Sequence, residues 1–506
     1  MIHPARPSAK YARFDAEIAW RCRARSRIIR ARCWLARMQF DSFTFVLFFV
    51  LVLGAYNGLR AWSARKWLLL AASYVFYAAW NPAFVLLLAG STTLDWWIAQ
   101  RIHAAAGPAR KRWITLTLIV NLSVLGLFKY QRFLLDNIAA LLALVGIHYV
   151  PARFDIVLPA GISFYTFHSL SYCIDVYRGT FAPTRNWRDY ALYVGFFPQL
   201  VAGPITRFPQ MRPQIESPRG TTRDGLGLGC ALLVLGLFEK CVLADSIFAP
   251  VADAFFNAPG AAAAGVAWSG VLAFSGQIFC DFAGYSTCAI GTALAFGFAL
   301  PTNFRLPYAA LGFSDFWRRW HISLSSWLRD YLYVSLGGNR HGEWRTYRNL
   351  LLTMLIGGLW HGAAWTFVIW GGLHGLFLAA ERFVRAHLWP KDRTVPAFLR
   401  AGYMLLTLLL VALAWVFFRA PDLSAALNIL TLLWPSSLGA PLDPAQKLAL
   451  LAFAGVVAVH WAMRDRDVKE FCARVPAPAI GLALGLLITA IVLSPGDSHA
   501  FIYFQF

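Results

Sequence analysis

The stretch IGGLWHGAAWTFVIWGGLHG, residues 356–375, decides how the whole chain is interpreted. It is apolar enough and long enough to cross about 30 Å of hydrocarbon as a helix. It nevertheless carries a histidine, His361, between glycines and tryptophans. An ionisable side chain inside lipid is unfavourable unless it is paired or reaches a water-filled cavity. His361 is therefore a candidate functional residue, and the alternative is a buried histidine that hydrogen-bonds a neighbouring helix.

The composition extends this membrane character to all 506 residues, because 58% of them are apolar and only 14% are charged. Near-continuous apolar runs recur at 41–59, 67–80, 83–99, 114–128, 134–149, 156–174, 189–205, 225–247, 264–300, 349–380, 402–418, 447–463 and 478–494. The runs 264–300 and 349–380 are each long enough for a helix pair or a broken helix. We predict an all-α polytopic membrane protein with about 10 to 13 spans.

The net charge of +21 is spread over short loops such as RAWSARK, PARKRW and RDRDVK rather than gathered on one soluble module. This distribution fits the positive-inside rule, so nucleic acid is not predicted as a partner. The eight cysteines form no C-x-x-C pair, and we predict neither a disulfide framework nor a metal site. The chain also lacks G-x-S-x-G, P-loop and H-E-x-x-H motifs, which argues against familiar hydrolases, NTPases and zinc proteases.

Residues 1–37 differ from the rest, with ten Lys or Arg against Asp15 and Glu17. We interpret them as a basic, disordered arm or as a misassigned start, since MQFDSFTFVLFFV from Met38 resembles a natural beginning. A mitochondrial presequence is the alternative, because such segments are rich in arginine and poor in acids. Residues 38–506 are predicted to form one multi-pass membrane domain.

Two further segments carry polar side chains that suit chemistry. FSDFWRRWHISLSSWLRDYLY, residues 313–333, predicts one amphipathic interfacial helix that contains His321, with packing at the interface as the alternative role of this histidine. In GQIFCDFAGYS, Gln277, Asp281 and Tyr285 recur at helical spacing and form one polar stripe. The stripe either lines a cavity or lets Asp281 hold a neighbouring helix end.

Four segments together resemble the membrane-bound O-acyltransferase (MBOAT) family, and in particular its bacterial alginate O-acetylation branch. These segments are LPAGISFYTFHSLSYCIDVYRG (158–179), GFFPQLVAGPITRFPQM (195–211), GQIFCDFAGYSTCAIG (276–291), and the two histidine motifs RWHISLS and GLWHG within 315–375. The signature core covers about residues 156–382. His168, Thr287 and Ser335 stand where this branch more often has glutamine, aspartate and proline.

The resemblance implies that His361 is the catalytic histidine and that His321 is a second signature residue. It also implies a helix bundle around a tunnel, where a cytoplasmic acyl thioester meets an acceptor. A neutral imidazole is well suited to take the proton of an attacking hydroxyl. Arg318 and Arg319, in a segment with seven arginines, are candidate ligands of the donor phosphates or of an acidic carrier protein. Positive-inside anchoring is the alternative for each arginine.

We therefore predict an inner-membrane O-acyltransferase, most simply an O-acetyltransferase, that modifies an exported polysaccharide such as alginate. Its catalytic residues are His361 and His321, and further substrate-binding candidates are Asp281, Tyr285 and Gln277. No bound cofactor is predicted, and the donor is acetyl-CoA, another acyl-CoA or an acyl-carrier thioester. The expected partners are the bilayer, a periplasmic SGNH-type acyltransferase and polysaccharide export machinery. The alternatives are D-alanyl transfer to a cell-wall polymer and a transporter or flippase.

The arm before Met38 is predicted to be dispensable, because it lacks an apolar face and precedes the first apolar run. A chain that starts at Met38 should retain membrane insertion and glycan acylation. The test compares protein abundance in membrane fractions and the acyl content of the glycan for both forms. Loss of either property would show that the arm takes part in insertion or activity.

Overall fold

The computed structural model describes residues 38–152, 156–260, 262–388, 396–434, 441–466, 474–494 and 501–502. These residues form helices and connecting segments without any strand, which confirms the predicted all-α class. Residues 1–37, predicted as a basic arm, lie outside the described residues.

Apolar side chains cover much of the outer surface of the helices. Seven helical segments are long and apolar enough to cross a membrane, and three shorter apolar helices accompany them within the described residues. Phe43 is 73% exposed and Val492 is 76% exposed, and the helix α23 (Ala477–Leu493) has no buried residue. Exposed apolar side chains at this density suit contact with lipid rather than water. The chain is a multi-pass membrane protein.

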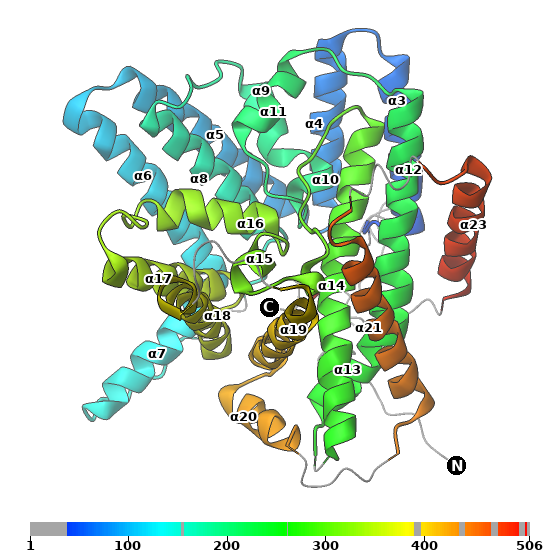
Figure 1. The fold of residues 1–506 in the computed structure, drawn as a ribbon. Helices are drawn as coiled ribbons and strands as arrows, with labels where there is room; N and C mark the ends of the chain where they lie inside the picture. The colour runs from blue at the N-terminus through cyan, green and yellow to red at the C-terminus, as the bar shows by residue number, and fades with distance from the viewer. Residues whose placement is uncertain are drawn as a thin grey trace, which may run out of the picture.

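The N-terminal helices gather around a core rich in phenylalanine and tyrosine. They are α3 (Phe43–Gly58), α4 (Trp62–Ala78), α5 (Pro82–Ala104), α6 (Gly107–Leu125), the π-helical turn η1 (Gly126–Tyr130), α8 (Ile162–Arg178), α9 (Trp187–Gly195), α10 (Phe197–Leu200) and α11 (Phe208–Glu216) (Figure 1). The helix α7 (Gln131–Leu144) follows η1, has no buried residue and extends away from this core (Figure 1). Local signals set several boundaries. At the start of α5, for example, the Asn81 side chain accepts a hydrogen bond from the amide of Ala83, and Pro82 takes the first helical position.

A central column connects this core to a second one. It consists of α12 (Arg223–Leu237), the π-helical η2 (Phe238–Phe248), α13 (Ala249–Asn257) and α14 (Ala264–Ala295), and α12 stands beside α14 in Figure 1. The predicted run 264–300 is thus one continuous helix of 32 residues rather than a pair. Residues from its first two thirds enter the second core, and residues near its end enter the N-terminal core.

Glycines allow α12 and α14 to pack with their backbones almost in contact. A Cβ atom on Gly291 would lie 2.5 Å from the carbonyl oxygen of Gly229, and one on Gly284 would lie 2.6 Å from that of Gly236. The two pairs repeat seven residues apart on each helix, so they lie along one interface. Small residues at such contacts are a usual means of packing helices in lipid, where the hydrophobic effect does not drive helices together.

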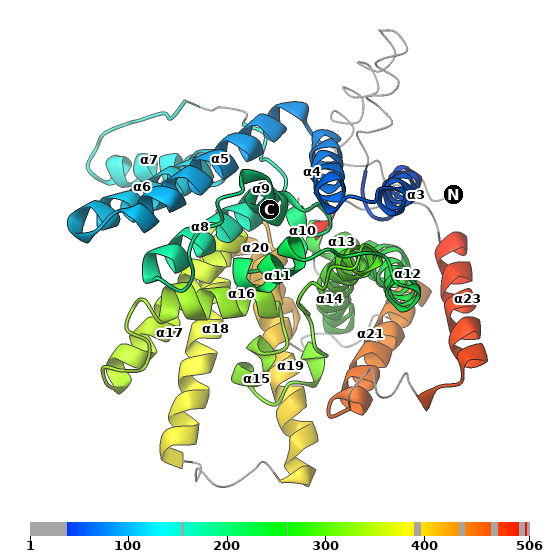
Figure 2. The same cartoon turned by 90° about the horizontal axis from the view of Figure 1, so that it is seen from above.

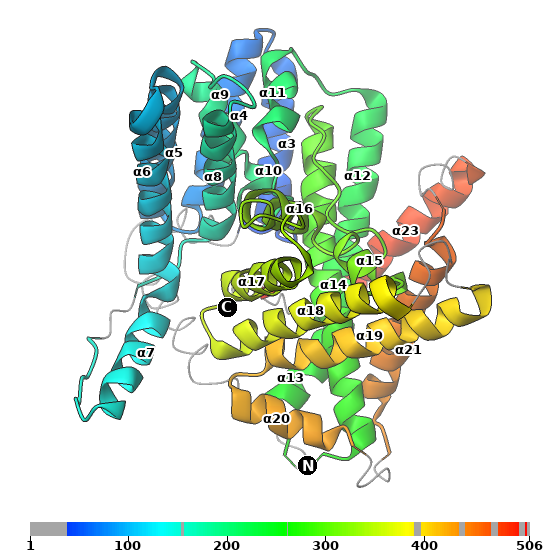
Figure 3. The same cartoon turned by 60° about the vertical axis from the view of Figure 1, so that its left-hand side comes forward.

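The remaining helices form the second half of the molecule. They are the 3₁₀ turn η3 (Pro307–Ala309), α15 (Phe313–Trp317), α16 (Ile322–Trp327), the π-helical turn η4 (Leu328–Tyr333), α17 (Glu343–His361), α18 (Trp365–Phe383), the π-helical turn η5 (Val384–Leu388), α19 (Ala397–Arg419), α20 (Leu423–Leu432) and α21 (Pro444–Met463). The run 349–380 is a helix pair, one of the two alternatives predicted for it. Figures 2 and 3 show α17, α18 and α19 crossing the direction of α14.

Replacing Gly291 by alanine should destabilise the protein by about 1 to 3 kcal/mol, because the added methyl group overpacks the contact with α12. The measurement is the thermal unfolding midpoint of the detergent-solubilised protein. Gly90→Ala is the matched control, since Gly90 lies in α5 with nothing within 4 Å of an added Cβ atom. An equal midpoint for Gly291→Ala and the unchanged protein would contradict close packing of α12 on α14.

Candidate active site

His361 is the last residue of α17 and is only 3% exposed. The helix ends there because Gly362 adopts extended backbone angles and leads into the turn before α18. The two helices approach so closely that a Cβ atom on Gly358 or on Gly371 would overlap a backbone carbonyl group of the other helix. The small residues noticed around His361 therefore serve close packing of this helix pair.

His321 lies between α15 and α16 and is fully buried. Its backbone has a φ of 42°, in the left-handed region that non-glycine residues rarely adopt. Asn303 stabilises this turn: its carbonyl oxygen accepts from the amide of Ile322 at 2.9 Å, and its Oδ1 accepts from the Ser323 hydroxyl at 2.9 Å. Strained backbone of this kind persists only where the surroundings fix it, and it is frequent at functional sites.

The strained turn corrects the prediction of one amphipathic helix over 313–333. The segment divides into α15, α16 and η4, with His321 at the first break. Sequence periodicity did not reveal the break, because the apolar residues keep helical spacing on both sides of it. Asn303, which supplies the competing hydrogen bonds, belongs to a preceding loop.

The fold brings the two predicted histidines together. The ring centroids of His321 and His361 are 6.2 Å apart, although forty positions separate them in the sequence. The Trp360 and Trp370 rings lie 5.0 Å from the His361 ring, and Phe282 of α14 lies 4.6 Å from the His321 ring. These rings exclude water from the pair, and electrostatic interactions are stronger in such surroundings.

His374 is a third buried histidine near the pair, and the sequence analysis passed over it. Its ring lies 4.9 Å from Trp370, which also contacts His361, and 5.1 Å from Trp317. The signal was present, because His374 stands in the same apolar stretch as His361. Its position next to Trp370 makes it part of the surroundings of the candidate site.

The polar stripe of α14, formed by Gln277, Asp281 and Tyr285, contacts residues outside the histidine pair. Asp281 forms an ion pair with Lys240 at 2.7 Å and accepts a hydrogen bond from the amide of Ile502 at 2.7 Å. Lys240 also pairs with Asp245 at 2.9 Å. Asp281 therefore holds a neighbouring helix and the segment near the end of the chain, which was one of its two predicted roles. Its role in substrate binding stays a prediction.

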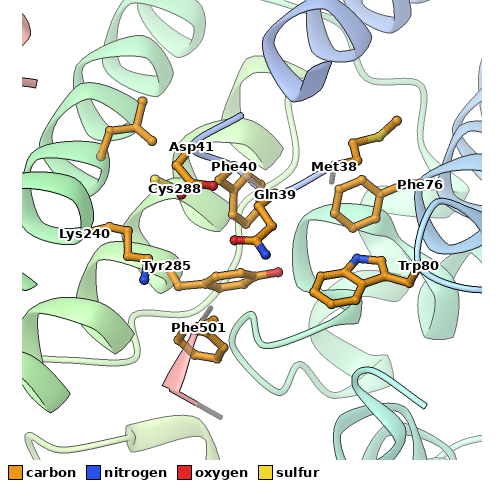
Figure 4. A pocket seen from close by; sticks show the side chains of 11 residues that line it. Met38, Gln39, Phe40, Asp41, Phe76, Trp80, Lys240, Tyr285, Cys288 and Phe501 are labelled. Carbon is orange, nitrogen blue, oxygen red and sulfur yellow. The ribbon is translucent and has the colours of Figure 1, made fainter. Parts of the chain in front are cut away.

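Tyr285 lines a small cavity that also contacts Gln39, Asp41, Lys240 and Phe501 (Figure 4). The cavity measures about 20 Å³, which is room for about one water molecule. Gln277 is 6% exposed, and its Oε1 atom has no hydrogen-bond partner among the described residues. The roles of these two side chains in substrate binding stay predictions as well.

The two adjacent arginines have different surroundings. Arg319 pairs with Asp315 at 2.9 Å, and Arg464 pairs with the same carboxylate at 2.7 Å. Burial raises the pKa of Asp315, but the hydrogen bonds from the Leu311 amide and the two arginines outweigh burial, so this pKa is lowered. Arg318 is exposed and faces an open cleft of about 520 Å³. The cleft is lined by Leu311, Asp315, Arg318, Arg385, Arg400, Arg464 and Asp465.

Within the part of the chain that the structure describes, no group of three or more His, Cys, Asp or Glu side chains comes together. The chemistry available to the site is that of two imidazoles, the surrounding indoles and a basic cleft.

Comparison with known proteins agrees with this arrangement. Residues 184–398 match the membrane-bound O-acyltransferase family model. The chain is 47% identical over 392 residues to "Probable alginate O-acetylase AlgI" of Azotobacter vinelandii, which covers 77% of this chain and 76% of the relative. It is 41% identical over 394 residues to "Peptidoglycan O-acetyltransferase" of Helicobacter pylori, covering 72% of this chain and 73% of that protein.

A lower similarity connects the chain to "Teichoic acid D-alanyltransferase" of Lacticaseibacillus rhamnosus, with 28% identity over 255 residues, 46% of this chain and 62% of that protein. The higher identities extend over most of the chain, and the matched family region 184–398 contains both histidine motifs. The protein is therefore a multi-pass acyltransferase that belongs to the membrane-bound O-acyltransferase family.

Proposed function

We propose that the protein is an O-acetyltransferase of the bacterial inner membrane. It passes an acetyl group from a cytoplasmic thioester, acetyl-CoA or an acetylated carrier protein, toward an exported polysaccharide such as alginate. The observation that carries this proposal is the buried contact between His321 and His361, two residues far apart in the sequence. The names of the relatives, "Probable alginate O-acetylase AlgI" and "Peptidoglycan O-acetyltransferase", support the acetyl group and the polysaccharide.

His361 acts as the general base. Its imidazole takes the proton of an acceptor hydroxyl as the hydroxyl oxygen attacks the thioester carbonyl carbon, so a new C–O bond forms. The C–S bond then breaks, and the thiolate leaves with the proton that the imidazolium returns. His321, with its ring close to His361 and its backbone fixed by Asn303, orients the base or the donor.

The tetrahedral intermediate needs hydrogen-bond donors for its oxyanion. The indole nitrogens of Trp360 and Trp370 are buried and have no hydrogen-bond acceptor among the described residues. Both rings lie 5.0 Å from the His361 ring, centroid to centroid. We assign the oxyanion to these two N–H groups, whose hydrogen bonds would form only when the negative charge develops.

The basic cleft at Arg318 receives the phosphates of the donor. Arg318, Arg385, Arg400 and Arg464 line it, and guanidinium groups bind phosphate through paired hydrogen bonds. The positive-inside rule supports a cytoplasmic position for this arginine-rich region, where acyl thioesters are made. Arg319 contributes indirectly, because it fixes Asp315 at the edge of the cleft.

D-Alanyl transfer from a carrier protein is the runner-up, and the lower identity to the D-alanyltransferase places it second. A transporter has no specific observation in its favour. For delivery beyond the membrane we propose a periplasmic SGNH-type acyltransferase and the polysaccharide export machinery as partners.

Replacing His361 by glutamine should lower acetyl transfer by about 10² to 10⁴-fold, because the amide keeps a similar volume but does not accept the proton. The measurement follows labelled acetyl groups from acetyl-CoA or an acetylated carrier into glycan in membranes that contain the purified protein. His321→Ala should cause a serious but smaller loss, because this residue orients the base or the donor.

His341→Gln is the matched control for these variants, since His341 is exposed in a loop before α17. Its activity should equal that of the unchanged protein. If His361→Gln kept substantial activity while His321→Ala had none, the two roles would be reversed. Activity in both variants would reject the proposed site.

Arg318→Ala should raise the KM for the donor about 10-fold while leaving kcat nearly unchanged, because a charge-assisted hydrogen bond contributes about 1.5 to 3 kcal/mol. The measurement is the dependence of the rate on acetyl-CoA and on an acetylated carrier protein. Arg345→Ala serves as control, since Arg345 is exposed in the first turn of α17 outside the cleft. An unchanged dependence for both donors would remove Arg318 from the donor site.

A further inference from the structure

The C-terminal end of α17 is held by a segment that the sequence analysis did not single out. Lys129 and Tyr130 belong to the π-helical turn η1 between α6 and α7. The Lys129 ammonium donates hydrogen bonds to the carbonyl oxygens of Trp360 at 2.6 Å and His361 at 2.9 Å. The Tyr130 hydroxyl donates to the carbonyl oxygen of Leu359 at 2.9 Å. Two adjacent side chains thus reach the last three carbonyl groups of the helix.

These hydrogen bonds satisfy carbonyl groups that have no hydrogen-bond partner within the helix. The last four carbonyl groups of any α-helix have no partner within that helix. Leaving a buried carbonyl unsatisfied is unfavourable, by about 1 to 3 kcal/mol for each group. A cation is also stabilising at a helix C-terminus, where the peptide dipoles leave a partial negative charge. Lys129 therefore stabilises the helix end through its two hydrogen bonds, and its protonated form adds this electrostatic contribution.

The π-helical turn explains how neighbouring residues point to the same place. In a π-turn the chain gains one residue relative to an α-helix, and such turns are frequent at functional sites. The same contact face continues along α7. The Phe133 ring lies 5.7 Å from the Trp365 ring, and Asn137 Oδ1 accepts a hydrogen bond from Trp365 Nε1 at 2.9 Å.

Lys129, Phe133 and Asn137 follow one another at four-residue spacing, so they share one face of their segment. That face touches the end of α17 through Lys129 and the start of α18 through the other two residues. The short turn 362–364 between the two helices is thereby braced on both sides. His361 belongs both to this contact, through its backbone carbonyl, and to the candidate site, through its side chain.

We infer that Lys129 is a positioning residue for the acyl transfer. It holds the terminal turn of α17, and thus the backbone of His361, at the place where this imidazole faces His321. This inference rests on the proposed function of His361. Lys129 does not exchange a proton with the substrate in this role. It acts through the geometry of the helix end, where a displacement of about 1 Å can lower a rate by about 10²-fold.

The test uses the full-length protein in lipid nanodiscs, with Lys129→Met as the main variant. Methionine is an unbranched, slightly shorter side chain that lacks the ammonium group. Lys447→Met is the matched control, because Lys447 is exposed near the start of α21. Two kinds of measurement are made for each protein: the kinetic constants kcat and KM with acetyl-CoA or an acetylated carrier, and the rate of amide hydrogen exchange of residues 356–361.

Lys129→Met should lower kcat about 10- to 100-fold, leave the donor KM within about twofold, and speed amide exchange in the terminal turn of α17. Lys129→Arg, which retains a cation that can donate, should recover a large part of kcat. Tyr130→Phe removes only one of the three hydrogen bonds and should show a smaller change in the same direction. This variant also keeps the test valid if Lys129→Met does not accumulate. Lys447→Met should match the unchanged protein in both measurements.

Unchanged amide exchange in Lys129→Met and Tyr130→Phe would overturn the inference, whatever the activity. A rise in KM with normal kcat would also overturn it, because Lys129 would then act on the donor. Failure of the proposed function gives a different result: His361→Gln stays active, and Lys129→Met speeds amide exchange without lowering kcat.

Discussion

Backbone carbonyl and amide groups at membrane depth must find their hydrogen-bond partners within the protein. The candidate site depends on the side chains and backbone groups that supply these partners where two helical segments end. At His321 the helical course breaks, and Asn303 accepts the hydrogen bonds that start α16. At His361 the helix α17 ends, and Lys129 with Tyr130 supplies the donors. Both histidines are thus found at interruptions of helices that distant residues stabilise.

Close packing turns these two helix ends into a single site. Because Gly358 and Gly371 let α17 and α18 touch, Trp370 of the second helix lies against His361 of the first. Aromatic contacts continue from Trp370 to His374 and from His374 to Trp317, which directly precedes Arg318 of the basic cleft. The histidine pair and the cleft are therefore joined by packed rings rather than by a polar surface. Such surroundings favour acyl transfer over hydrolysis, because they exclude water.

Some charged side chains form ion pairs that hold the fold together, and others face an open cleft. The residues beside them in the sequence do not show which of the two applies. Arg319 and Arg464 are engaged with Asp315, and Arg464 also lines the open cleft that Arg318 faces. Asp281, which shared a stripe with Tyr285, is engaged with Lys240 and with the amide of Ile502. A buried carboxylate is stable only when it is paired, so these ion pairs form part of the fold itself.

The sequence by itself determined the membrane environment and the all-helical class, because the length of an apolar run is a local property. It also made His361 a candidate functional residue, because an ionisable residue within such a run is visible locally. It also pointed to His321 through a motif. Only the tertiary structure decided that the two imidazoles meet, that the helix over 313–333 breaks, and that Arg318 and Arg319 differ. Lys129 was missed for the same reason: its partners are carbonyl groups about 230 positions away. Periodicity describes which face of a helix is apolar, but hydrogen bonds between distant segments arise only when the helices pack.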